Sequence, residues 1–184
     1  FCNIPDRTKL NADISSCLDD LIDWFASNRL QLNLQKSEFM WCGSSRRIRA
    51  LAHEPVRLGH NSFPPVLSTR CLGVYFDSEM SFRTHITKTV ASCFAILRQI
   101  RSIRRSVSPA LLTSVVVALV HSRLDYCISL LAGIPSAQLC RLQAVLNSAA
   151  RLIFGCDRYS SVSPLLKKLE WLPVRARIQL RIVT

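Results

Sequence analysis

The chain has 184 residues, of which 49% are hydrophobic and only five are Gly. This length and composition exclude a disordered tail and allow one or two domains with a real core. The net charge of +12 is unevenly distributed: residues 1–84 carry +1 (10 basic and 9 acidic side chains), and residues 85–184 carry +11 (14 basic and 3 acidic). The positive excess of the second part indicates a polyanionic partner, either nucleic acid or an anionic membrane surface.

The first predicted element is a helix that Asn11 or Asp13 caps and that runs to about Ser27, with apolar side chains every three or four residues. The only adjacent carboxylates, Asp19 and Asp20, lie within this helix. A two-metal site needs carboxylates that converge from separate elements, and consecutive helical side chains point about 100° apart. We therefore interpret this pair as solvated acids on a helix face.

The next segments are short and mostly extended. Leucines alternate with polar residues over 30–34, which predicts a short strand or an extended run. Residues 43–47 form a predicted turn, and residues 48–70, rich in Pro, Gly and polar residues, an irregular connector with a weak strand near 56–58. A further strand is expected over residues 72–76.

From His85 onward the pattern becomes helical, with Ser108 and Pro109 as a cap and first-turn pair and Gly155 at a helix end. Short loops favour antiparallel neighbours and hence a helical bundle. The predicted fold class is α+β, predominantly α: a helix with short antiparallel strands in residues 1–84, then an antiparallel bundle in residues 85–184. The helical segments are expected over residues 85–105, 108–131, 136–154, from 163, and from 173 onward.

Four arginines lie on the polar face of the first of these helices, namely Arg98, Arg101, Arg104 and Arg105. A charged face of an amphipathic helix is ordinarily only solvated. The excess positive charge of this part of the chain favours phosphate contacts instead.

The eight cysteines are spread singly, without a C-x-x-C pair or a His pair at metal-ligand spacing, so no metal site is predicted. Reduced thiols are typical of an intracellular protein, nuclear or cytoplasmic, and no signal peptide is apparent. The uncharged segment 106–122 falls short of the ~20 predominantly apolar residues of a membrane span. We expect a buried helix there and no membrane partner.

Three runs of residues, taken together, resemble the late palm of a reverse transcriptase from a non-LTR (LINE-type) retrotransposon: Leu30–Glu38, Cys71–Asp77 and Ser81–Ile86. A fourth run, Leu169–Ile178, resembles the Leu-x-Trp-Leu-Pro-Val-x-x-Arg-Ile signature found after the polymerase thumb in that family. The resemblance covers essentially the whole chain. It implies a palm remnant with a hairpin over residues 1–84, then a thumb-like bundle and a post-thumb segment.

The resemblance also implies roles for particular residues. Lys36 would contact the incoming triphosphate or protonate the leaving pyrophosphate as a general acid, but only in an intact polymerase. Gly73 and Tyr75 would belong to the primer grip, since Gly permits close backbone approach and Tyr can stack on a sugar or base. From the residues alone, the competing interpretations are that Lys36 is an ordinary solvated lysine and that Tyr75 is an ordinary tyrosine of a strand.

In that family the catalytic aspartates precede the region that this chain resembles. The chain is therefore expected to be inactive as a polymerase by itself, with no cofactor of its own, and Mg²⁺ is implied only for an intact enzyme. The implied partners are RNA and DNA as template and primer, and the N-terminal polymerase region. Alternative hypotheses are a non-catalytic nucleic-acid-binding module, a helical interaction protein, and a translated transposon relic without selected function.

Overall fold

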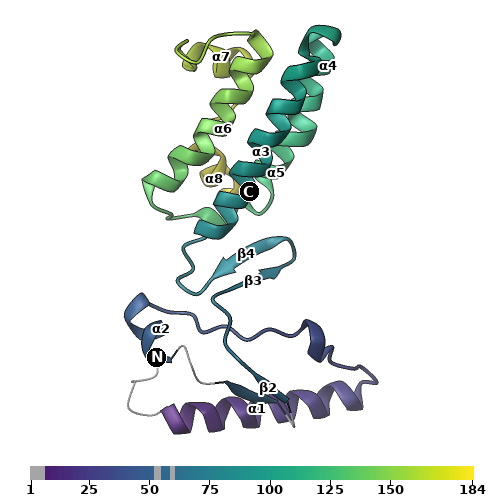
Figure 1. The fold of residues 1–184 in the computed structure, drawn as a ribbon, viewed down its shortest axis with the longest axis vertical. Helices are drawn as coiled ribbons and strands as arrows, with labels where there is room; N and C mark the ends of the chain where they lie inside the picture. The colour runs from purple at the N-terminus through teal and green to yellow at the C-terminus, as the bar shows by residue number, and fades with distance from the viewer. Residues whose placement is uncertain (1–6, 52–54, 59–60) are drawn as a thin grey trace. The chain divides into compact units, whose positions relative to one another are not determined.

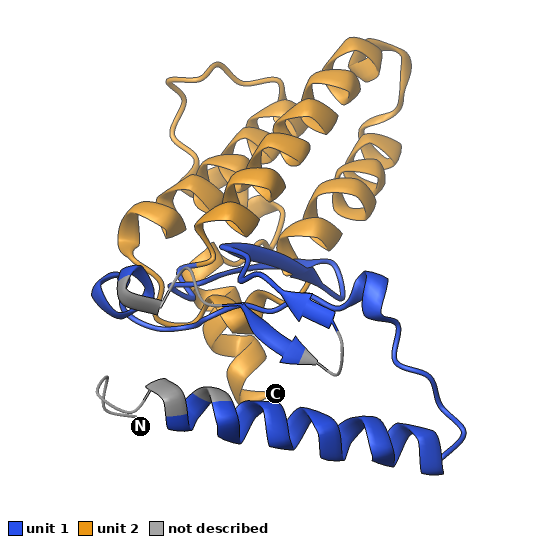
Figure 2. Ribbon diagram, turned by 60° about the horizontal axis from the view of Figure 1, so that its bottom comes forward, with its two compact units in different colours: residues 1–81 blue, residues 82–184 orange. Residues whose placement is uncertain are grey.

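The computed structural model describes residues 7–51, 55–58 and 61–184, which form mostly helices and two short antiparallel strand pairs. This confirms the predicted α+β, predominantly α class. The chain divides into two units, residues 1–81 and residues 82–184 (Figure 2). The sequence pattern places the division three residues later, after residue 84.

Unit 1 begins with a long helix, α1 (Arg7–Ser27), which starts earlier than its predicted caps (Figure 1). Nothing in its first residues breaks a helix, and Lys9 and Leu10 favour one. The helix ends where Nδ2 of Asn28 donates to the Trp24 carbonyl at 2.8 Å. One face packs on strand β1 with four half-buried apolar side chains, Ile14, Leu18, Ile22 and Phe25.

The segment after α1 forms no strand, so the strand alternative for residues 30–34 is wrong. A short 3-10 helix, η2 (Leu34–Lys36), stands there instead. Asn33 caps it, because its side-chain oxygen accepts a hydrogen bond from the Lys36 backbone N–H at 3.2 Å. Leucine alternation alone does not make a strand, which also needs a partner that offers hydrogen bonds.

Residues 43–77 contain more regular structure than predicted. The predicted turn at 43–47 is in fact the start of a helix, and the connector contributes two additional strands. The elements are α2 (Ser45–Leu51), β1 (Val56–Leu58), β2 (Asn61–Phe63), β3 (Ser68–Cys71) and β4 (Val74–Asp77). β1 pairs antiparallel with β2, and β3 with β4. Each strand is stabilised by its pairing partner, which single-sequence propensity does not reveal.

Unit 2 is a bundle in which α3 (Arg83–Ile103) packs along α6 (Ser136–Phe154) (Figure 1). A single 3-10 turn, η3 (Arg104–Ser106), follows α3. The predicted caps are confirmed: the Ser108 hydroxyl accepts from the Leu111 N–H at 3.3 Å, and Gly155 ends α6 with a φ of 70°. Two shorter helices, α7 (Ser163–Lys168) and α8 (Val174–Val183), pack against α6.

The second predicted helix of the bundle is interrupted. It comprises α4 (Pro109–Val116), a π-helical turn η4 (Val117–His121) and α5 (Ser122–Asp125), and a 3-10 turn, η5 (Ile128–Leu131), follows. The left-handed backbone of Cys127 (φ 53°) separates α5 from η5. The buried apolar residues of this interrupted helix are four apart: Leu112, Val116, Val120 and Leu124. In a regular α-helix such a row drifts by about 40° per step, and the wider π turn reduces that drift.

Candidate nucleic-acid interface

Three arginines form a row along the exposed face of α3 and of the η3 turn that follows it. Arg98, Arg101 and Arg105 are all exposed and follow one another at three- and four-residue spacing, which places them on one side of the helix. The opposite side is buried against the bundle through Cys93, Leu97 and Ile100. Within the described part of the chain, none of the three guanidinium groups has a hydrogen-bond or ion-pair partner. Their donors therefore face solvent and can bind an anion.

Arg104, the fourth predicted residue, is placed differently. It is half-buried, and its guanidinium lies against Gly155 at the C-terminal end of α6. A Cβ built on Gly155 would lie 1.8 Å from Nη2 of Arg104. A cation near the last carbonyls of a helix is favoured by the helix dipole. The Arg104 guanidinium thus lies against the end of α6. Those of the other three arginines have no hydrogen-bond or ion-pair partner in the described part of the chain.

Several other basic side chains of unit 2 hold the bundle together. Arg151 donates through Nε and Nη2 to the Ser160 carbonyl at 3.2 and 3.0 Å. Arg123 donates to the Ser92 hydroxyl at 3.2 Å, and Arg141 donates to Thr87 Oγ1 at 3.0 Å. These groups already use donors inside the protein, whereas the donors of Arg98, Arg101 and Arg105 are open to an external phosphate.

A groove lies beside this row, between α3 and α6. Its volume is about 340 Å³. Its lining combines apolar side chains with two arginines and a serine: Phe94, Leu97, Arg98, Arg101, Ser148 and Leu152. Phe94 is half-buried.

Lys36, the predicted general acid, ends η2 in unit 1 and is exposed. An open hollow of about 360 Å³ lies beside it, lined by residues 31–35. The nearby Glu38 carboxylate accepts a hydrogen bond from the Thr69 hydroxyl of β3. That hydrogen bond joins the segment that carries Lys36 to the hairpin that carries Tyr75.

Gly73 and Tyr75 lie in the β3–β4 hairpin, but the predicted strand over 72–76 is shifted. Leu72 and Gly73 form the turn, with φ values of 47° and 86°. Positive φ at both central residues is typical of a two-residue hairpin turn, which explains a Gly here. Tyr75 is half-buried on β4 opposite Arg70, whose guanidinium lies 5.5 Å from the ring centroid.

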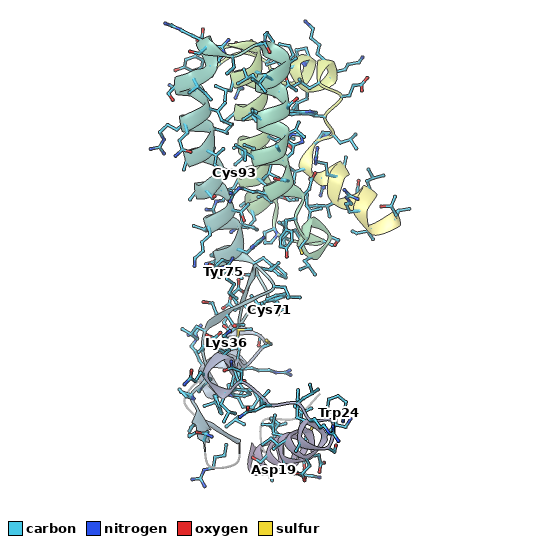
Figure 3. All side chains as sticks on the ribbon, turned by 90° about the vertical axis from the view of Figure 1, so that its right-hand side faces the viewer. Asp19, Trp24, Lys36, Cys71, Tyr75 and Cys93 are labelled. Atoms are coloured by element: carbon cyan, nitrogen blue, oxygen red, sulfur yellow. The ribbon has the colours of Figure 1, made fainter. Side chains whose placement is uncertain are left out.

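The carboxylates that the structure describes in unit 1 do not fit a two-metal centre. Asp19 and Asp20 are exposed neighbours on α1, and Figure 3 shows Asp19 well apart from Lys36. Among residues 7–51, 55–58 and 61–184, no three His, Cys, Asp or Glu side chains gather as metal ligands would. The donor set that the structure describes therefore supports no step through Mg²⁺.

One buried polar cluster was not anticipated from the sequence. Arg177 of α8 donates through Nε to Oδ1 of Asp125 at 2.8 Å and through Nη2 to its other oxygen. The same Nη2 lies 3.3 Å from Nδ1 of His121, whose ring is 3.9 Å from that of Trp171. The spacing of His121 and Asp125, four residues apart on one helix, was the only available signal.

The protonation of His121 follows from these contacts. Arginine only donates, so Nδ1 accepts and the proton of the neutral ring is on Nε2, which is buried and has no partner among the described residues. Burial and the Arg177 charge lower the pKa of His121 to about 4, although the Asp125 carboxylate acts in the opposite direction. His121 is therefore neutral at pH 7 and stabilises the bundle rather than binding an anion.

Comparison with protein-family models, with curated proteins and with solved structures finds no match. The resemblance to a retrotransposon reverse transcriptase therefore rests on the motif residues alone. In the part of the chain that the structure describes, every helix is too short or too polar to cross a membrane.

Proposed function

We propose that the chain is part of a non-LTR retrotransposon reverse transcriptase and that residues 82–184 hold template and primer RNA or DNA through phosphate contacts. The observation that supports this most directly is the exposed row of Arg98, Arg101 and Arg105, in a unit with a large positive excess. The motif residues support the polymerase origin. The proposed compartment is the nucleus or the cytoplasm.

We propose that the chain has no polymerase activity by itself. Its described carboxylates do not converge, and two-metal phosphoryl transfer needs carboxylates that do. The role of Lys36 and the use of Mg²⁺ then belong to an intact enzyme only. Leu21 and Trp24, 41% and 55% exposed on the outer face of α1, support a contact with the remaining polymerase region.

Binding is tested with the whole chain and an RNA–DNA hybrid over a range of salt concentrations. Each phosphate contact contributes a slope of about −0.9 in log affinity against log salt for B-form DNA, so three arginines should give roughly −3. Reversing Arg98 and Arg101 to Glu should reduce the slope by about 2, and equally for unrelated sequences. The matched control is the same double reversal at Arg175 and Arg181, which are exposed on α8.

An affinity that does not depend on salt, or an equal loss in both double variants, would refute the arginine row as the phosphate contact. Primer extension with Mg²⁺ separates the two parts of the proposal. We expect none from the pure chain. Extension that disappears in Asp19→Asn/Asp20→Asn would show that the chain is an active polymerase, whereas binding without extension is also what a non-catalytic nucleic-acid-binding module would show.

A further inference from the structure

The groove between α3 and α6 has features that phosphate binding alone does not explain. Contacts with a duplex backbone require only exposed positive charge. Here the two arginines line a hollow of about 340 Å³ together with the apolar side chains of Leu97 and Leu152 and the half-buried ring of Phe94. That volume is at the lower end for small-molecule sites, which suits a single nucleotide.

The chemistry of the lining matches one base with its neighbouring phosphates. An aromatic ring offers stacking to any base, and the apolar side chains of Leu97 and Leu152 complete a floor from two helices. Arg98 and Arg101 are separated by three residues, a rise of about 4.5 Å along one side of α3. They therefore stand beside the hollow, where the phosphates that flank an inserted base would lie.

We propose that this groove receives one unpaired base of a single-stranded nucleic acid, with Phe94 stacked on the base and Arg98 and Arg101 on the flanking phosphates. The inference rests on the proposed nucleic-acid binding and specifies that the bound nucleic acid has an unpaired base at the groove. A paired base is held in its stack and does not enter. The strand is therefore unpaired where it enters the groove, and sequence has little influence, because every base has a face that can stack.

An acidic peptide is the competing occupant, because carboxylates also pair with arginine. The charges favour nucleic acid: Arg105, in the η3 turn, extends the row beyond the end of α3, and a regularly charged backbone satisfies three cations in line. Residues 85–184 contain only three acidic side chains, and one of these, Asp125, is already paired with Arg177. This part of the chain therefore attracts a polyanion along its length.

The experiment compares two labelled single strands by fluorescence anisotropy with the whole chain. One is oligothymidylate, and the other has the same length and phosphates with abasic sites in place of bases. We expect the normal strand to bind about tenfold more tightly, which corresponds to one stacked base. Phe94→Ala should remove that difference by weakening only the normal strand. Arg98→Glu/Arg101→Glu should weaken both strands.

A second variant tests the groove independently, in case Phe94→Ala does not fold. Ser148 lines the groove from α6, and its hydroxyl donates only within its own helix, to the Ala144 carbonyl at 2.8 Å. Ser148→Leu should fill the hollow and abolish the preference for bases, while circular dichroism stays unchanged. Arg175→Glu, on α8, should leave the preference intact.

The outcomes separate the two proposals. Equal affinity of wild-type protein for both strands would overturn base insertion and leave phosphate binding standing. No salt-dependent binding of either strand would overturn both. Displacement of oligothymidylate by polyglutamate at lower concentration than by abasic strand would assign the groove to an acidic protein segment instead.

Discussion

Acid should destabilise unit 2 through His121, which lies between Arg177 and Trp171. In the folded protein its pKa is about 4, and in the unfolded chain it returns to the ordinary value of 6.5. The unfolded state therefore binds more protons between these values. The stability from the neutral ring is complete above pH 6.5 and is lost as the pH falls toward 4.

The magnitude follows from the two pKa values. Linkage gives a loss in the free energy of unfolding of about 2 kcal/mol at pH 5 and roughly 3 kcal/mol at pH 4, relative to pH 8. This is a large part of the ~5–15 kcal/mol that stabilises a typical domain. Burial also lowers the pKa of His85 and acts in the same direction, so the wild-type curve alone does not isolate His121.

The assay is urea unfolding, followed by circular dichroism, of wild-type protein and His121→Phe at pH 8 and pH 5. Phe keeps a ring against Trp171 and cannot be protonated, and His85 is present in both proteins. We expect the wild type to lose about 2 kcal/mol more than the variant between the two pH values. An equal loss in both, or a His121 ring that titrates near 6.5 by NMR, would refute this reasoning.

Three further predictions concern other parts of the structure. Gly155→Ala should destabilise unit 2 more than Gly133→Ala in thermal unfolding. Both glycines have a positive φ, but only a Cβ at position 155 would meet the Arg104 guanidinium, and equal effects would contradict that contact. Cys93 should react with iodoacetamide only on unfolding, since burial raises its thiol pKa to about 11, and fast labelling of the native protein would disprove this. Val116→Asp places a charge at a fully buried position and should lower the free energy of unfolding of unit 2 by several kcal/mol, enough to unfold it. Retention of the helical signal of unit 2 would show that the position is not in the core.

The sequence predicted long helices well and short elements poorly. The 3–4-residue apolar period of α3 and α6 extends over many turns, and their ends carry explicit signals, such as the Gly155 cap. By contrast, β2 and α2 fall in segments interpreted as a connector and a turn. Strands of three residues have no period to detect, and they exist because of pairing across the hairpin.

The candidate site was predictable in part for a related reason. Helical spacing placed Arg98, Arg101 and Arg105 on one face, but it did not distinguish Arg104, whose surroundings depend on a residue of α6. The groove is formed by side chains of two helices about 50 positions apart in the chain, Phe94 and Ser148 among them. Only the packing of α3 on α6 brings them together.

The side chains and backbone of the late run Leu169–Ile178 are used for packing. In this structure Trp171 packs on the buried His121 ring, the Val174 N–H donates to Gln143 Oε1 at 2.9 Å, and Arg177 binds Asp125. Each of these contacts attaches the start of α8, or the residues just before it, to the bundle, and none involves the exposed arginine row. Replacing Arg177 would leave Asp125 as a half-buried unpaired carboxylate, a change that destabilises the fold. These residues therefore stabilise the architecture of unit 2, and the proposed phosphate contacts lie on a separate surface of α3 and η3.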